Sequence, residues 1–469
     1  MEVYADESDP LPGEMIDAIE LPDRPQSSYE LEVRLLASAH FRLSSALVQP
    51  LFIERMKSRT ANVRFTITVV SAETLQKVEK KPASVCAEFF YEGRPVGKVM
   101  RNVELVGITP FPKPKSLEGL PKARMAIAID PGTVAADLVV TVTSQLENDN
   151  RHFWCTVMTR LLPEYTRGIT DEWITAEVTS AVVGNFMRDF TKAGLNKIER
   201  LAKLRGAGKD LYKASPDIFK EVFWKLIDSN ASLKSIAIVS DEPFVPWELM
   251  IPYRKSEEGA PPDVRDPLGV EFLVGRMTRR SHVAGAQRVP LRDSYVVAPV
   301  FEGPRSLPHA QKEADFVTSL FPGARIDPAN FESLNVKLDP CRSLLHFACH
   351  GEVTSQGQQI LYLDDEKEFS AVDLNGLPGP ERGIPIARPL VFLNACQVGR
   401  PVPGLVGVNG FAATFTEMGA QAVVAPLWSV KDTIAHEIAL NFYTIAKKDK
   451  SVPFAEILRQ QREIGRAHV

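Results

Sequence analysis

The chain has 469 residues, of which 44% are hydrophobic and 24% charged, and its formal net charge is −4. This composition is ordinary for a globular protein, and roughly 150 residues per domain allow about three domains. The small negative charge gives no electrostatic case for binding nucleic acid, and no apolar run approaches the ~20 residues that cross a bilayer. The five scattered cysteines do not suggest a disulfide framework, and the first residues lack the basic-then-apolar pattern of a signal peptide, so we expect a cytoplasmic protein.

The two ends of the chain differ in composition from the rest. Residues 1–30 carry nine acidic residues and a single basic one, Arg24, together with several prolines. This pattern predicts a disordered acidic tail or linker, with an acidic docking tail as the alternative. The last residues, Glu463–Val469, break the amphipathic pattern before them and read like a translated sequencing adapter. We therefore expect residues 463–469 to be a non-native tail.

The first folded region is expected to be all-β. Polar and apolar residues alternate with a period of two over Asn62–Val70, and in part over Ser84–Tyr91 and Val134–Thr143. Glu92–Pro95 has the composition of a turn between two strands. The pattern predicts a β-sandwich-like accessory domain over residues 31–150. It contains no catalytic constellation, and we expect a partner-binding role.

A helical period follows, starting near Asp171. Apolar residues recur at three- and four-residue spacing, which predicts a helical connector over residues 151–211 and a short helix over Asp217–Leu226. Arg205–Asp210 superficially resembles a phosphate-binding loop. It lacks the upstream glycine at the required spacing, the following Ser or Thr, and a preceding buried strand, so nucleotide binding is disfavoured.

From Ser235 onward the pattern alternates between strands and helices, which is typical of an α/β layer architecture. The expected strands are Ser235–Val239, Phe272–Arg276, Ser294–Val300, Ile360–Asp364 and Ala422–Trp428, and the expected helices are His309–Leu320, Gly410–Met418, Thr433–Lys447 and Pro453–Gln461.

Two further strands carry residues with catalytic chemistry. The apolar run Leu344–Cys349 leads into His350, and the run Pro389–Ala395 leads into Cys396. A short continuous apolar run is typical of a strand buried on both faces of a parallel sheet. In such sheets the reactive groups lie at the carboxyl ends of the strands. The sequence therefore predicts that His350 and Cys396 form a base–nucleophile dyad.

This pair suits nucleophilic catalysis, because an imidazole can pair with a thiolate or accept its proton. Each residue alone would more commonly be structural. Zinc binding by His346, Cys349, His350 and Cys396 is the metal alternative. The alternation of a strand places Cys349 on the opposite face from His346 and His350, so we predict no metal site and no cofactor. His346 and Cys349 are expected to pack within the sheet.

Three segments together, Leu345–Gly351, Leu393–Gly399 and Ala420–Asp432, resemble the CHAT family of caspase-like cysteine peptidases, which is more distantly related to caspases and separase. The segment Glu242–Leu249 is similar to the opening of that family. The resemblance covers roughly residues 212–462. It implies a caspase-like three-layer α/β/α domain with a mostly parallel sheet at the C-terminus, preceded by the β-sandwich-like domain and the helical connector.

The resemblance also implies residue roles. His350 and Cys396 would be catalytic, and the main-chain amides of Gly351 and Cys396 would bind the oxyanion. A side chain at Gly351 would crowd the approaching carbonyl. In separase-like relatives an acid at the position of Asp432 recognises a basic residue before the cleaved bond, whereas Ser429 stands where some relatives have another acid. The alternative for Asp432 is the N-cap of the helix expected from Thr433.

By the same resemblance we expect a cysteine endopeptidase of a bacterial defence or programmed-death system. Its protein substrate would be encoded nearby, and a protein partner would activate it by reorganising the loops beside the catalytic strands, in particular the Gly- and Pro-rich segment Gly376–Pro389. No direct contact with nucleic acid or membrane is expected. The alternative is a catalytically silent caspase-like scaffold for protein assembly.

Overall fold

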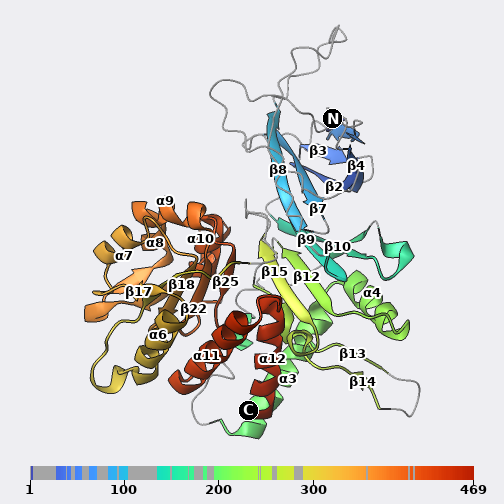
Figure 1. Cartoon of the computed structure of the whole chain (residues 1–469). Helices are drawn as coiled ribbons and strands as arrows, with labels where there is room; N and C mark the ends of the chain where they lie inside the picture. Colours follow the sequence, from blue (N-terminus) through green and yellow to red (C-terminus); the bar gives the residue numbers. More distant parts are fainter. Residues whose placement is uncertain are drawn as a thin grey trace. The chain divides into compact units, whose positions relative to one another are not determined.

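The computed structural model of the chain (Figure 1) describes residues 2–3, 28–38, 40–43, 48–54, 63–70, 83–91, 94–103, 135–147, 150–166, 168–173, 183–186, 195–240, 242, 244–255, 261–278, 289–354, 357–399, 402–404 and 407–468. They belong to two compact units. The first comprises residues 1–136 and 143–154, and the second comprises residues 137–142 and 155–469.

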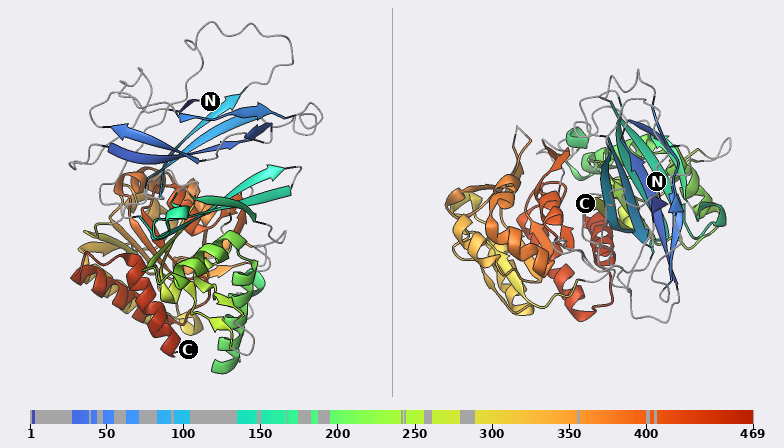
Figure 2. Two further views of the ribbon diagram at one scale, coloured as in Figure 1. Left: turned by 90° about the vertical axis from the view of Figure 1, so that its right-hand side faces the viewer. Right: turned by 90° about the horizontal axis from the view of Figure 1, so that it is seen from above.

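The first unit contains antiparallel sheets. A four-stranded sheet has the order β4 (Val48–Glu54), β2 (Ser28–Ala37), β7 (Ala83–Tyr91) and β8 (Arg94–Val103), shown in blue in Figure 2. Alternate residues of β2 are buried in its core: Tyr29, Leu31, Val33 and Leu35. Two ribbons pair β1 (Glu2–Val3) with β5 (Val63–Arg64) and β3 (Phe41–Leu43) with β6 (Ile67–Val69).

These antiparallel sheets agree with the all-β pattern of the sequence, while the sandwich arrangement stays a prediction. Of the acidic tail predicted over residues 1–30, only β1 and the first residues of β2 are described. The remainder lies outside the described residues.

Two five-stranded sheets form the framework of the second unit. The first has the order β11 (Ile169–Trp173), β10 (Asn150–Thr159), β9 (Leu138–Glu147), β12 (Ser235–Ser240) and β15 (Leu273–Thr278). Strand β12 runs parallel to both of its neighbours, β9 and β15. Two helices follow β11, namely α3 (Lys197–Ala214), which begins with a capping box between Asn196 and Glu199, and α4 (Asp217–Asp228).

Two sequence interpretations need correction here. The segment Val134–Thr143, assigned to the sandwich, enters the sheet that contains β12, since Leu138–Val142 pair in parallel with that strand. Leu138, Val139 and Val140 are all buried, which is typical of a central parallel strand rather than a half-exposed antiparallel one.

The region predicted as a helical connector also begins with strands, β10 and β11. In β10 Phe153, Cys155 and Val157 are buried, but so are Thr156, Met158 and Thr159, so the strand lacks a clean alternation with period two. Helix α3 starts only at Lys197. Most of the apolar residues expected on a helix over 178–190 lie outside the described residues, apart from 183–186, which are helical.

The second sheet positions the candidate site. Its order is β17 (Gly323–Arg325), β16 (Ser294–Val297), β18 (Leu344–Ala348), β22 (Leu390–Asn394) and β25 (Ala422–Val424), and each pair of neighbouring strands runs parallel. The two central strands, β18 and β22, are buried along their length except at Asn394. The mostly parallel sheet predicted for the C-terminal region is therefore confirmed.

Helices pack on both faces of this sheet (Figure 1). One face is covered by α6 (Pro308–Leu320), α11 (Asp432–Lys448) and α12 (Phe454–His468). The other is covered by α7 (Phe331–Lys337), α8 (Ala371–Gly376), α9 (Pro378–Ala387) and α10 (Phe411–Glu417). Helices α11 and α12, red in both figures, are neighbours.

The segment Gly376–Pro389, expected to be a loop, contains helix α9. Pro378 stands at the first helical position, where proline is well tolerated. A side-chain carbon on Gly379 or Gly383 would lie less than 2 Å from a main-chain oxygen of residue Asn335 or Leu338. The glycines therefore allow close packing against α7 and its C-terminal end, rather than loop flexibility.

Short elements complete the described fold. They are the antiparallel strands β19 (Gly351–Val353), β20 (Gln359–Tyr362) and β21 (Glu368–Ser370), the ribbons β13 (Tyr253–Arg254) with β14 (Asp263–Val264) and β23 (Val402–Gly404) with β24 (Gly407–Asn409), helix α5 (Leu268–Glu271), and the 3-10 turns η1 (Pro163–Tyr165), η2 (Trp247–Leu249), η3 (Gly303–Arg305) and η4 (Asp364–Glu366).

Candidate active site

The parallel register of β18 and β22 brings the ends of the two strands together. Ala348 is paired with Asn394 at the end of the ladder, so His350 and Cys396 each lie two residues beyond this last pair. An added Cβ on Gly351 would lie 2.8 Å from the main-chain oxygen of Cys396, which shows how closely the two backbones approach. The two predicted dyad residues thus lie just beyond the ends of two neighbouring strands.

The half-buried His350 ring is held by the main chain of another loop. Its Nε2 lies 2.7 Å from the carbonyl oxygen of Arg305, and its ring centroid lies 4.8 Å from that of Phe301. Because a carbonyl oxygen only accepts, Nε2 must carry the hydrogen in this contact. In the neutral ring Nδ1 is then the nitrogen that is free to take a proton. The sequence could not reveal this partner, since a main-chain carbonyl has no residue signature.

Cys396 is half-buried, and its thiol donates to the carbonyl oxygen of Val430, with 3.6 Å between Sγ and O. Among the residues that the structure describes, no hydrogen bond joins this thiol to the His350 ring. The next residue, Gln397, has a φ of 63°, in the left-handed region that a non-glycine residue seldom occupies. Backbone strain of this kind clusters at functional sites.

A buried amide side chain, Gln359 of β20, organises the turn after Cys396. Its Nε2 donates to the carbonyl oxygens of Gln397 at 3.3 Å and Val398 at 3.1 Å, and its Oε1 accepts from the amide of Phe411 at 2.8 Å. The residue is 2% exposed, so these bonds are costly to lose. Sequence reasoning missed Gln359, which could have been noticed as a polar residue in an otherwise apolar strand.

A buried polar cluster lies beneath the nucleophile strand. Glu313 of α6 is 1% exposed, and His346 of β18 is fully buried. The Glu313 carboxylate lies 2.6 Å from His346 Nε2 and accepts from Asn394 Nδ2 at 2.8 and 3.0 Å. Asn394 also donates to the carbonyl oxygen of Ala435, and His346 Nδ1 lies 2.8 Å from the Tyr443 hydroxyl. Burial, and next the Glu313 charge, raise the pKa of Tyr443 well above its usual value.

Three of the other cysteines, Cys155, Cys341 and Cys349, are poor candidates for a nucleophile. Burial raises the pKa of Cys155 and Cys349, and it raises the pKa of Cys341 to about 12. Thiols that ionise so reluctantly are inert at neutral pH. Cys396 differs from Cys155 and Cys349 because it stands half-buried at a strand end.

The alternation predicted for the His350 strand is confirmed. His346 packs toward α6 and α11, whereas Cys349 belongs to the core on the opposite face. Both are buried in the sheet, as the sequence predicted. Within the described ranges, no group of three or more His, Cys, Asp or Glu side chains is arranged to hold a metal ion.

The candidate specificity residue Asp432 is the first residue of α11, and the residue before it, Lys431, provides no side-chain cap. The helix thus begins one residue earlier than expected, and Asp432 is not its N-cap. Instead, Asp432 Oδ2 accepts from the main-chain amide of His309 at 3.1 Å. The nearby Ser429 hydroxyl lies 3.1 Å from Gln397 Nε2. A role for Asp432 in binding a substrate cation stays a prediction.

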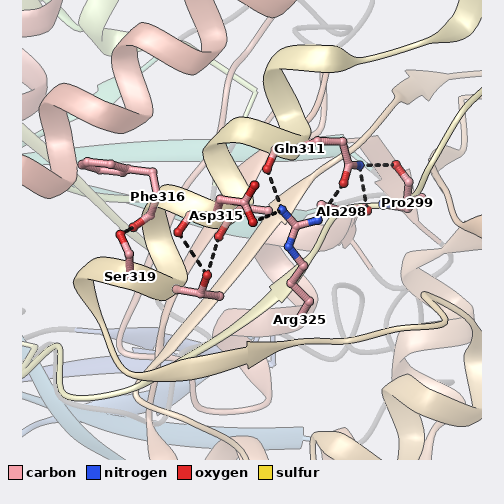
Figure 3. A network of polar contacts seen from close by, with 9 residues as sticks. Ala298, Pro299, Gln311, Asp315, Phe316, Ser319 and Arg325 are labelled. Atoms are coloured by element: carbon pink, nitrogen blue, oxygen red, sulfur yellow. Dashed lines mark hydrogen bonds and ion pairs between the residues drawn. The ribbon is translucent and has the colours of Figure 1, made fainter.

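A polar network between α6 and β17 fixes the beginning of the loop that contains Arg305, whose carbonyl oxygen contacts His350 (Figure 3). Gln311 Nε2 donates to the carbonyl oxygens of Ala298 and Pro299, both at 3.0 Å. Arg325 in turn donates to the side chain and carbonyl of Gln311 and to Asp315, at 2.6–2.7 Å. Helix α6, strand β17 and the residues after β16 are therefore tied together beside the site.

Comparisons with known proteins bear on the second unit. A search of solved structures finds, among others, the complex of the pro- and mature domains of RgpB from Porphyromonas gingivalis. It is 13% identical, with 63% of this chain and 74% of that chain covered and a TM-score of 0.33. No curated protein matches. In the described part of the chain, no helix has the length and apolarity needed to span a membrane. Residues 244–463 match the family model of the CHAT domain, a domain related to caspase-like peptidases, in agreement with the resemblance that the sequence motifs indicate.

Proposed function

We propose that the CHAT domain of this chain is a cysteine endopeptidase with Cys396 as nucleophile and His350 as its base. The observation that carries the proposal is the geometry of the two strand ends. Parallel pairing of β18 with β22 sets His350 beside Cys396, and the Arg305 carbonyl orients the imidazole with Nδ1 free. The match to a peptidase-related family supports the same assignment.

The reaction would proceed by acyl transfer. The Cys396 sulfur attacks the scissile carbonyl, and its proton passes to His350 Nδ1. The amides of Gly351 and Cys396 donate to the resulting oxyanion. The carbon–nitrogen bond then breaks, the amine leaves with the proton from His350, and a thioester remains on Cys396. Water, deprotonated by His350, hydrolyses the thioester and restores the thiol.

The resting protein is activated by a protein partner in this proposal. The Cys396 thiol is hydrogen-bonded to the Val430 carbonyl rather than to the imidazole, so it must rotate before it can react. A partner that displaces the residues around Val430 would release the thiol. The family resemblance adds a bacterial defence or programmed-death setting, with a protein substrate encoded nearby.

Asp432 is the candidate for recognising a basic residue before the cleaved bond. Its Oδ2 accepts from the His309 amide, and the partly buried carboxylate lies two residues from Val430, which contacts the thiol. Peptides that carry Arg, Lys, Leu or Met before the scissile bond test this role. Equal cleavage of all four would remove it.

The main experiment compares the wild type with Cys396→Ala and His350→Ala. Each is incubated with the protein products of neighbouring genes, with and without candidate activators, and a thiol-directed activity probe is applied in parallel. A cut made only by the wild type supports the peptidase. Probe labelling that is unchanged by Cys396→Ala, together with no cut, would favour the catalytically silent scaffold.

A further inference from the structure

Helix α6 begins without a cap of its own. Its N-cap residue, Leu307, makes no side-chain hydrogen bond to the helix, and the first helical residue is Pro308, which has no N–H. The amide of His309 is therefore the first donor that the helix presents, and such donors have no partner within a helix. Asp432 supplies the acceptor from a different helix, α11, with 3.1 Å between the amide nitrogen and Oδ2.

The two helices that meet at this bond follow the two loops that contact the dyad. The loop before α6 contains Arg305, whose carbonyl oxygen holds the His350 ring. The loop before α11 contains Val430, whose carbonyl oxygen receives the Cys396 thiol. The hydrogen bond between Asp432 and the His309 amide therefore connects the loop that contacts His350 to the loop that contacts Cys396.

Neighbouring contacts hold α6 and α11 in place around this hydrogen bond. Helix α6 is fixed on its other side by the network of Gln311 and Arg325 (Figure 3). Helices α6 and α11 pack against each other, and the rings of His309 and His436 lie 5.3 Å apart. The negative charge of Asp432 also lies at the N-terminal ends of both helices, where a helix dipole favours an anion.

We infer that Asp432 is a positioning residue that holds the His350 loop and the Cys396 loop in register, through its bond to the His309 amide. This inference rests on the proposed Cys–His dyad and assigns Asp432 a role that does not require contact with substrate. Asp432→Ala releases the two loops from each other, so the imidazole and the thiol lose the relative placement from which the thiol can rotate to meet Nδ1. Asp432→Asn keeps an oxygen that accepts the same hydrogen bond.

The test measures the rate at which iodoacetamide alkylates Cys396 at neutral pH, followed by mass spectrometry of the peptide that contains it. The imidazole accelerates this reaction by promoting the thiolate, so His350→Ala sets the rate of an uncoupled thiol. We expect Asp432→Ala to be about tenfold slower than the wild type, within the ~100-fold loss that a misplacement of about 1 Å causes. Asp432→Asn should stay within about twofold of the wild type, since it restores the bond.

A second pair of variants removes the donor instead of the acceptor. His309→Pro deletes the amide hydrogen at a first-turn position that tolerates proline, whereas His309→Ala keeps the hydrogen and loses only the ring. His309→Pro should match Asp432→Ala, and His309→Ala should exceed it in rate. If Asp432→Ala fails to fold, the two His309 variants still test whether the hydrogen bond positions the loops. A circular dichroism spectrum monitors folding in every variant.

The outcomes separate the two proposals. If His350→Ala does not slow alkylation, the dyad is wrong and the positioning role falls with it. If His350→Ala slows alkylation but Asp432→Ala and His309→Pro do not, the positioning role alone is overturned. If Asp432→Asn is as slow as Asp432→Ala, charge rather than the hydrogen bond is responsible, and the inference is also overturned.

Discussion

The buried carboxylate of Glu313 offers the sharpest test of how the nucleophile strand is supported. Glu313 is 1% exposed and accepts hydrogen bonds from Asn394 Nδ2, while His346 Nε2 lies 2.6 Å from its Oε1. Asn394 stands two residues before Cys396 in the chain. Replacing Glu313 with alanine leaves the side chains of His346 and Asn394 without this partner in a region where water does not substitute for it.

The expected cost follows from these contacts. Each buried donor that loses its acceptor costs about 1–3 kcal/mol, which places the sum for the His346 ring and the Asn394 amide at about 2–6 kcal/mol. This range includes the ~3–5 kcal/mol that removal of one partner of a buried charged pair costs. Glu313→Gln keeps one acceptor oxygen but presents its own N–H₂ to a neighbouring donor. We therefore expect a smaller loss, of about 1–3 kcal/mol.

Urea unfolding followed by tryptophan fluorescence measures this loss in the second unit. All tryptophans except Trp154 belong to that unit, so the signal reports its unfolding. Glu437→Ala is the matched control, because Glu437 is exposed on α11 and should change the free energy of unfolding by no more than about 0.5 kcal/mol. A loss of less than about 1 kcal/mol for Glu313→Ala would show that the cluster does not support the strand.

Two further predictions concern the strand ends and acid stability. Gly351→Ala forces a methyl group to within 2.8 Å of the Cys396 carbonyl oxygen, so alkylation of Cys396 should slow at least about tenfold. Gly275→Ala, in β15 with open space around it, should leave the rate unchanged, and equal rates for both variants would contradict the steric argument. At Asp293, burial raises the pKa, but the hydrogen bonds from Ser343 and the hydrogen bond and charge of Arg342 together outweigh it and leave the pKa below its ordinary value. A lowered pKa means that the carboxylate stabilises the fold above the unfolded value of about 3.9, and that this stabilisation is lost as the pH falls through the folded value. The difference in unfolding free energy between wild type and Asp293→Asn should therefore shrink between pH 7 and about pH 3, and a constant difference would refute the assignment.

The sequence was most informative where a residue pattern has one physical explanation. The continuous apolar runs before His350 and Cys396 predicted buried parallel strands, and β18 and β22 are paired in parallel as expected. Parallel strands end at the same edge of a sheet, which is why two residues 46 positions apart in sequence could be predicted to meet. The burial of His346 and Cys349 on opposite faces followed from the same periodicity.

The sequence-based predictions were wrong where the same residues are compatible with more than one structure. Glycine and proline between Gly376 and Pro389 suggested a loop, but Pro378 fits the first turn of α9, and the glycines allow contact with residues that are distant in sequence. The strand at Leu138–Val142 was assigned to the wrong sheet because its parallel partner, β12, lies almost a hundred residues further along the chain. A pairing between strands so far apart in the chain cannot be predicted from the local sequence.

Most contacts that support the site depend on three-dimensional geometry, which cannot be predicted from single residues. The contact of Glu313 is an exception, because the sequence pattern could have indicated it. Arg305 contributes only a main-chain carbonyl, and Asp432 acts on the first turn of another helix, so neither role is visible in sequence. Glu313 differs, because it falls on the apolar face of α6 beside Ala310, Ala314 and Val317. His346 likewise interrupts an apolar strand. A buried carboxylate needs a partner, and two such interruptions in elements that pack together predict a pair. The Glu313–His346 contact could thus have been inferred from the rule that buried charges are paired, once the strand and helix had been placed on one another.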